Sequence, residues 1–439
     1  MKRIFGLLTI AALLLPSTVQ ARKWTLRECT QYALDHNISL KQSEVHVGQR
    51  EVDLSTARAS RLPSLSANAS ESFNFGRGLN ADNIYVNSNK TNTSLSLSTD
   101  MTLFNGLRIN NSIEMSRLNL EAATRDLEKA RDDIRVAVAQ AYVQVLYNQE
   151  IYGVAQRQVE IDSMQVVRLE EMQKNGKASA SQVASQKATL AKSRLSEVQA
   201  DNSLKLSILD LTQLLELTEP ENFDVVIPDV DMIPESLLTS VEDIYMQAIG
   251  IKPVVLSEES RLAYAEKNIA YAKGGYSPSL YLNGGLNTGY YTSSLMPSDK
   301  FFNQLSSNFG QYVGLSLSIP IFSRLSTRNN VRSAKLSYNQ QQLQLENVKK
   351  QLYKEIQQAF FNALASQSKY EGSIAAERSA QEAFSLMQAK YENGKASLTE
   401  FNESKGQYLE AASNLAQARY EYLYMTKLLD FYRGEEIDL

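Results

Sequence analysis

The sequence contains very few of the residues that carry most catalytic and metal chemistry. Its 439 residues include one cysteine, Cys29, and two histidines, His36 and His46. A single cysteine cannot form an intramolecular disulfide, which excludes a small secreted domain held together by disulfides. The histidines do not share a helix face, and Cys29 with His36 supplies only two ligands of a metal site. Because no glycine-rich phosphate loop or HExxH pattern is present either, we expect no catalytic residues, no metal and no cofactor.

Long apolar runs are also missing beyond the N-terminus. Residues 1–21 combine a basic start, an apolar run and a small-residue cleavage motif, which predicts a secretory signal peptide. The mature chain then begins at Arg22, with 43 Lys and Arg against 49 Asp and Glu. This acidic balance does not indicate binding to nucleic acid. No later stretch is long and apolar enough for a membrane-spanning helix, so a membrane-inserted part would have to be a β-barrel.

What the sequence does contain is a long internal repeat. The segment Asn-Gly-Lys-Ala-Ser at 175–179 recurs at 393–397, 218 residues later. A repeat of this length is far longer than a solenoid unit, so we interpret it as the duplication of a domain-sized half. The predicted organisation is a first repeat at 22–217, a proline-rich linker at 218–238 and a second repeat at 239–439.

Each repeat is predicted to contain the same elements in the same order: a helix, two strands, a long helix and a return helix. In the first repeat these are helix 25–60 interrupted near 35–37, strands 64–76 and 92–104 around a loop at 77–90, and helices 107–174 and 180–217. In the second they are helix 239–274 interrupted at 250–253, strands 280–290 and 309–319 around a loop at 292–306, and helices 324–392 and 398–433. Gly176 and Gly394 are expected at the hairpin tips, in the left-handed conformation that ends helices.

The four predicted strands each have one apolar and one polar face. Four such strands cannot close a barrel, and an open sheet edge in lipid leaves backbone groups without hydrogen bonds. Three chains would supply twelve strands, continued by a barrel of long helices. The predicted fold class is therefore an α+β membrane protein built as a homotrimer. The alternative is a soluble coiled-coil protein with one surface hairpin in each half.

Several motifs resemble those of the TolC family of outer-membrane efflux and secretion channels. The segment from Trp24 to Leu34 resembles the family's opening helix, and Tyr391 to Ser397 resembles its helical-hairpin tip. The segments at 62–65 and 277–280 resemble its junction between helix and first strand. The resemblance implies a trimer in the outer membrane with a helical tunnel in the periplasm. It also implies docking onto a periplasmic adaptor protein and an inner-membrane transporter of the RND or ABC type.

The halves differ at two positions of functional interest. Glu400 and Glu403 follow the second tip at the spacing of one helix face, whereas the first repeat has Gln182 and Ser185 there. The TolC family has aspartates at these two places, lining its periplasmic entrance. In a trimer, six carboxylates would surround one opening, bind cations and repel one another, which would raise some of their pKa values. The alternative is acidic residues favoured by the helix dipole.

The family's entrance is also closed by a Tyr and an Arg that bond to an acid. Tyr391 matches the Tyr, but Ala396 stands where the Arg would be and Gln182 where the acid would be. A latch of the family's type would therefore consist of neutral hydrogen bonds, or be missing.

The two tips are candidate docking sites for the adaptor, and the alternative is that they are helix turns alone. The residues proposed for docking are Gly176, Lys177, Ser179, Gly394, Lys395 and Ser397. The predicted function is a passive outer-membrane exit duct of a tripartite efflux pump or type I secretion system, embedded in outer membrane lipid. A surface-anchored structural or adhesive coiled-coil protein is the alternative from another class.

Overall fold

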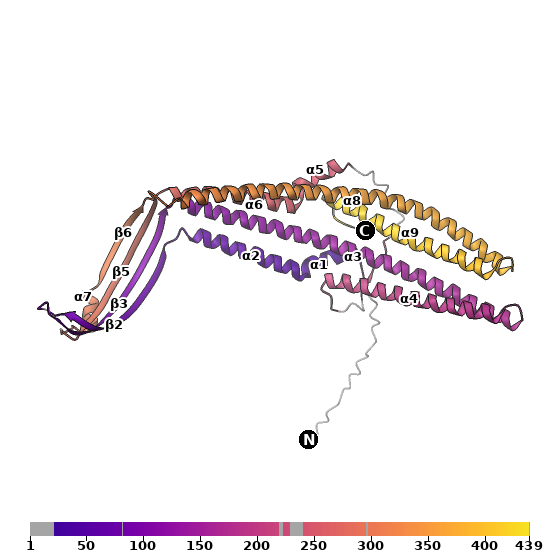
Figure 1. Ribbon diagram of the computed structural model, residues 1–439, viewed down its shortest axis with the longest axis horizontal. Helices are drawn as coiled ribbons and strands as arrows, with labels where there is room; N and C mark the ends of the chain where they lie inside the picture. The colour runs from indigo at the N-terminus through magenta and orange to yellow at the C-terminus, as the bar shows by residue number, and fades with distance from the viewer. Residues whose placement is uncertain (1–21, 81, 219–222, 229–239, 296, 439) are drawn as a thin grey trace, which may run out of the picture. The chain divides into compact units, whose positions relative to one another are not determined.

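The computed structural model describes residues 22–80, 82–218, 223–228, 240–295 and 297–438 (Figure 1). The predicted signal peptide at 1–21 and parts of the predicted linker lie outside these residues. The chain divides into two compact units, each with segments from both predicted repeats. Unit 1 comprises the described parts of Met1–Lys41, Ala130–Ala248 and Lys354–Leu439, and unit 2 those of Gln42–Lys129 and Ile249–Tyr353.

Unit 2 contains a four-stranded antiparallel sheet with the order β2-β3-β5-β6. Its strands are β2 Ser64–Leu79, β3 Tyr85–Phe104, β5 Ser279–Ser293 and β6 Gly310–Ser318. The register places like residues opposite one another: Leu97 pairs with both Ala67 and Leu286, and Ser98 pairs with Ser66. One face is therefore apolar and the other is rich in serine and asparagine, as the alternation predicted. The apolar face is bare in the single chain, with Val313 84% exposed.

The first hairpin is longer than the sequence indicated. The loop predicted at 77–90 is wrong, because β2 and β3 remain paired from Ser64 opposite Asp100 to Leu79 opposite Tyr85. Backbone pairing continues through residues 87–90 of β3, Asn-Ser-Asn-Lys, where the side chains are polar on both faces, so the alternation that reveals a half-buried strand is missing there. The loop predicted at 292–306 contains a short helix, α7 Phe301–Ser307, that the sequence analysis also missed.

The helices follow the prediction closely. The first repeat has α1 Leu26–His36, α2 Ile38–Ala59, α3 Arg108–Lys174 and α4 Ala180–Leu214. The second has α5 Val241–Ile251, α6 Pro253–Lys273, a 3₁₀ turn η3 Gly274–Tyr276, α8 Ser326–Glu392 and α9 Leu398–Tyr432. The long helices α3 and α8 have 67 residues each, and the return helices α4 and α9 have 35 each. None of the described helices is long and apolar enough to cross a membrane.

The predicted interruptions of the first helix in each repeat are confirmed. Asn37 separates α1 from α2, since its side-chain oxygen accepts the backbone N–H of Ser39 at 2.9 Å and caps α2. Its amide nitrogen donates to the carbonyl of Leu214 at 3.1 Å, which ties the break to the end of α4. In the second repeat, Pro253 begins α6 at the helix position that tolerates proline.

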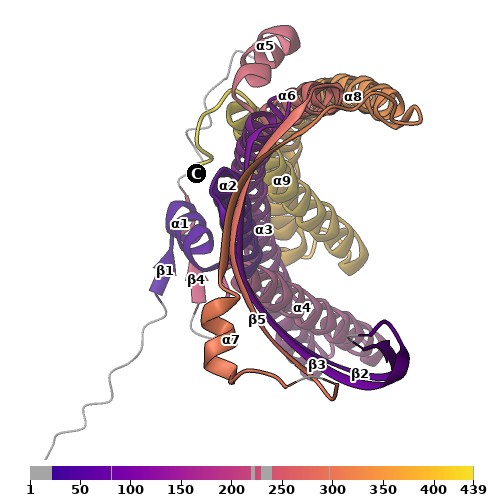
Figure 2. The ribbon, with the colours of Figure 1, turned by 90° about the vertical axis from the view of Figure 1, so that its left-hand side faces the viewer.

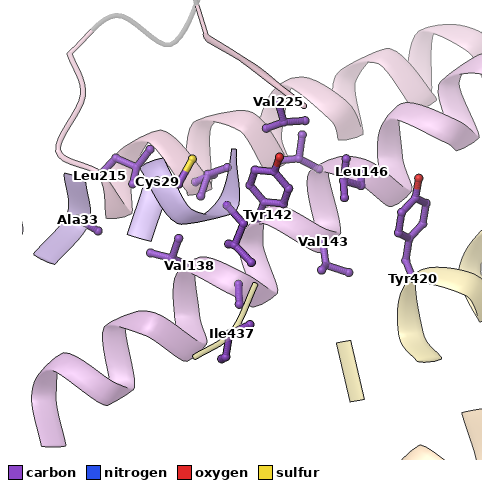
Figure 3. Close-up of a cluster of buried hydrophobic side chains, with 14 of the residues drawn as sticks. Cys29, Ala33, Val138, Tyr142, Val143, Leu146, Leu215, Val225, Tyr420 and Ile437 are labelled. Carbon is purple, nitrogen blue, oxygen red and sulfur yellow. The ribbon is translucent and has the colours of Figure 1, made fainter. Parts of the chain in front are cut away.

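The main core of unit 1 lies around Tyr142 on α3, where α1 packs (Figure 3). The Tyr142 hydroxyl lies 3.0 Å from the carbonyl of Trp24 and 2.7 Å from that of Val226, next to a small parallel sheet of β1 Arg22–Trp24 and β4 Phe223–Val225. This sheet was not predicted from the sequence. Cys29 is fully buried in the same core, and burial raises the pKa of its thiol to about 12.

Candidate functional site at the hairpin tips

The helical hairpins α3–α4 and α8–α9 each end in a tight turn (Figure 1), and the two turns are built alike. Gly176 and Gly394 have φ values of 73° and 70°, the left-handed conformation that glycine adopts without strain. The N–H of Lys177 donates to the carbonyl of Met172 at 2.8 Å, and that of Lys395 to Lys390 at 2.8 Å. This is the Schellman hydrogen bond, and it confirms the predicted helix ends at both tips.

The serine of each tip begins the next helix. The hydroxyl of Ser179 accepts the backbone N–H of Gln182 at 3.2 Å, and Ser397 accepts that of Glu400 at 3.2 Å. In return, the side chain of Gln182 accepts the N–H of Ser179 at 2.9 Å, and Glu400 accepts that of Ser397 at 2.7 Å. Each serine thus forms a capping box, which explains the Asn-Gly-Lys-Ala-Ser motif by helix-turn chemistry.

The acidic pair beyond the second tip is only partly free. The N–H and hydroxyl of Ser397 both donate to the Glu400 carboxylate, and they hold its pKa below the usual range. In the single chain these donors favour the ionised form of Glu400. The raised pKa values expected where six carboxylates converge concern the trimer and stay a prediction. Glu403 is exposed one turn further along α9. Among the described residues, no group of three or more His, Cys, Asp or Glu could hold a metal ion.

Tyr391 stacks on Phe401 of its own hairpin, with ring centres 4.9 Å apart, and it also contacts a residue of the first hairpin that the sequence did not single out. The guanidinium carbon of Arg168, on α3, lies 5.1 Å from the centre of the Tyr391 ring. Arg168 also donates from Nη2 to the carbonyl oxygen of Glu392 at 2.9 Å. Gln182 caps its own helix instead. Within unit 1, the second tip is therefore joined to the first hairpin by a cation–π contact and a hydrogen bond, not through Gln182.

A buried ion pair joins the same two hairpins further from the tips. Lys405 on α9 donates to Asp162 on α3, and their side chains are 4% and 0% exposed. The other oxygen of Asp162 accepts the Ser193 hydroxyl at 2.6 Å, and Gln186 donates to the carboxylate at 2.9 Å. Gln186 in turn accepts the amide of Asn402 at 3.3 Å. Removing one partner of such a pair would leave a buried charge uncompensated.

The two repeats differ in sequence at Asp162 and Arg168, which could have indicated both residues. At the offset of 218, Asp162 corresponds to Ala380 and Arg168 to Leu386. These differences are of the same kind as the one that singled out Glu400 against Gln182. In each pair a charged residue of the first repeat corresponds to an apolar one of the second, which is the signal that could have located both residues.

The sequence profile of the outer membrane efflux protein family matches residues 30–216 and 244–432. The chain belongs to this family. It is 25% identical to the outer membrane protein TolC of Escherichia coli over 409 residues, covering 91% of this chain and 80% of the relative. It is 24% identical over 366 residues to the cation efflux system protein CusC of E. coli O157:H7, covering 78% and 72%. The crystal structure of the Campylobacter jejuni CmeC outer membrane channel shares the fold, with a TM-score of 0.78, 20% identity, and coverage of 94% and 86%.

The two matched segments correspond to the two predicted repeats, although the repeat boundaries themselves stay a prediction. As a member of the outer membrane efflux protein family, the chain is a channel protein of the outer membrane that serves as an exit duct for efflux pumps. It is a transport protein and not an enzyme, and the family assignment rules out the structural or adhesive alternative.

Proposed function

We propose that three copies of the chain pool their strands into one twelve-stranded barrel in the outer membrane. The observation that carries this proposal is the four-stranded sheet, whose outer strands β2 and β6 have no further partner among the described residues. In lipid, each unpaired backbone group costs several kcal/mol, so these edges require strands from other copies. The bare apolar face suits lipid, and the serine-rich face suits a water-filled lumen.

Exposed apolar residues on the helices support the same assembly. Ile38, Val45 and Val52 on α2 are 55%, 64% and 64% exposed and recur every seven residues. This heptad spacing is typical of a seam between packed helices, and the side chains are bare in the single chain. In the proposed trimer, helices of neighbouring copies pack along such seams to form a tunnel in the periplasm.

The tips of the tunnel are proposed to dock a periplasmic adaptor, which connects the duct to an energised inner-membrane transporter. Since the Asn, Gly and Ser of each tip are occupied by turn chemistry, the exposed side chains of Lys177 and Lys395 are the ones free to contact a partner. The duct itself carries out no reaction and depends on the transporter for energy. We propose that Glu400 and Glu403 from three copies surround the entrance and attract cations.

Two measurements test this proposal. Mass measurement in detergent should give a trimer, and a monomer would refute the shared barrel. In lipid bilayers, conductance should favour cations and be blocked by trivalent cations added from the tip side. The double variant Glu400→Gln, Glu403→Gln should lose the block and keep its fold, because glutamine at position 182 already forms the equivalent capping box. The control is Glu392→Gln, before the turn, and an unchanged block in the double variant would show that the acids only support the helix.

A further inference from the structure

The strand β5 is longer than its neighbour β6, which leaves part of one edge uncovered by strand pairing. Their register ends with Asn287 opposite Gly310, whereas β5 continues to Ser293. Residues 288–293 of β5 therefore have no partner in β6. An edge of this kind is costly in lipid, because its N–H and carbonyl groups lack water.

Side-chain amides from α7 and the residue after it cover this edge. The N–H of Tyr291 donates to Oε1 of Gln304 at 3.0 Å, and Nε2 of Gln304 donates to the carbonyl of Tyr291 at 3.0 Å. Two residues earlier, the carbonyl of Gly289 accepts Nδ2 of Asn308 at 2.8 Å. Alternate residues of a strand present their backbone groups to the same edge. The two side-chain amides therefore supply hydrogen bonds that a longer β6 would have made to this edge.

The helix α7 also leans over the apolar face of the sheet. The Thr288 hydroxyl donates to the carbonyl of Leu305 at 2.6 Å, and the rings of Tyr290 and Phe301 meet edge to face at 4.9 Å. Thr288 pairs with Leu95 and Tyr290 with Thr93, so both side chains point to the apolar side. In Figure 2, α7 lies on the convex side of the curved sheet, which is the outer side of any barrel that the sheet would close.

The exposed surface of α7 is aromatic and uncharged. Phe302 is 79% exposed, and the rest of the helix after the two phenylalanines is Asn-Gln-Leu-Ser-Ser. Phe73 on β2 and Phe309 before β6 are exposed near the same end of the apolar face. From this end of the sheet, the segment of β5 from Tyr290 back to Leu280 alternates between apolar and polar residues. It is about as long as a tilted strand must be to cross the hydrocarbon region of a membrane. Aromatic girdles mark the two rims of such regions.

We propose that α7 is an interfacial anchor that inserts Phe302 into the outer leaflet of the outer membrane. The inference rests on the proposed function, in which the apolar face of the sheet contacts lipid. The partner is the boundary between lipid headgroups and hydrocarbon, because α7 continues the apolar face and combines aromatic rings with neutral amides and hydroxyls. The same helix thus protects the edge of β5 and fixes the depth of the barrel.

Spin labels on single cysteines in the full chain, reconstituted in phospholipid vesicles, test the anchor. Cys29 needs no replacement, because it is fully buried and its thiol pKa is about 12. Phe302→Cys is the test variant, Leu286→Cys in the middle of the apolar face is the lipid reference, and Asp82→Cys in the β2–β3 turn is the water reference. Accessibility to oxygen and to a water-soluble nickel chelate gives the depth of each label.

The label at position 302 should be reached by oxygen more readily than by the chelate, at a depth between the two references. A label at 302 that matches Asp82→Cys, while 286 lies in lipid, overturns the anchor and leaves the proposed barrel intact. If the label at 286 is also in water, the proposed membrane position of the sheet fails, and the anchor fails with it. Ser306→Cys, one turn along the same side of α7, repeats the test if the first variant does not fold.

Discussion

The buried pair between Lys405 and Asp162 gives the sharpest test of how the two hairpins of unit 1 are joined. Replacing Lys405 by Met leaves the fully buried Asp162 carboxylate with only the donors of Ser193 and Gln186. Removing one partner of a buried ion pair costs about 3–5 kcal/mol. Since 1 kcal/mol shifts the thermal midpoint by about 2–4 °C in units of 150–250 residues, we expect a decrease of roughly 6–20 °C.

The chain provides a matched control at the equivalent position of the first repeat. Lys187 lies 218 residues before Lys405 and pairs with Glu170 at 2.7 Å, but these side chains are 56% and 40% exposed. Exposed pairs contribute at most about 1 kcal/mol, so Lys187→Met should lower the midpoint by less than about 4 °C.

Thermal unfolding of the protein in detergent, followed by far-ultraviolet circular dichroism, measures both shifts at one heating rate. The double variant Asp162→Asn, Lys405→Met should lose less than the sum of the two single variants, because it contains no uncompensated buried charge. Equal shifts for Lys405→Met and Lys187→Met, or strictly additive losses in the double variant, would refute the reasoning.

Three further outcomes are expected from other parts of the chain. Native Cys29 should not react with maleimide until the protein unfolds. Because burial raises the pKa of its thiol to about 12, its contribution to stability is complete below the unfolded pKa near 9 and is lost as the pH rises toward 12. Comparing the unfolding of the native protein and a Cys29→Ala variant at high pH would check this. Gly394→Ala should lower the stability of the protein by about 1–2 kcal/mol, because a φ of 70° strains alanine. Gly372→Ala inside α8 should raise the stability by up to about 1 kcal/mol, and equal thermal midpoints of the two variants would contradict this. Gln304→Ala should lower the stability of the protein by about 1–3 kcal/mol, because it leaves the β5 edge without its hydrogen bonds, whereas Asn303→Ala should have little effect. The temperature at which heating changes the gel mobility of each variant measures this difference.

The features that the sequence predicted are those set by local chemistry. Asn175 and Gly176 end α3, and Ser179 begins α4, through hydrogen bonds to residues within five positions. Such bonds depend only on residue type and spacing, so the tips could be located within a residue or two. The apolar alternation of the strands was equally readable, because one face of the sheet is apolar over most of each strand.

The features that were missed depend on partners distant in the sequence. Residues 87–90 of β3 are polar on both faces, so only their backbone pairing with β2 makes them part of a strand. Gln304 can bond to the edge of β5 only because β6 stops short of that edge, which no local pattern reveals. Asp162 and Arg168 resemble ordinary charged helix residues until the second hairpin places Lys405 and Tyr391 beside them.

The division of the chain into units has a consequence for biogenesis. The buried pair joins positions 243 apart, and both compact units need segments from the second half of the chain. Neither unit can therefore be completed while the second half is still being synthesised or secreted. Contacts between distant segments also form slowly, because the intervening chain must first be ordered. The first half consequently lacks a complete core until the last helix has been made, and it is open to aggregation and proteolysis until then.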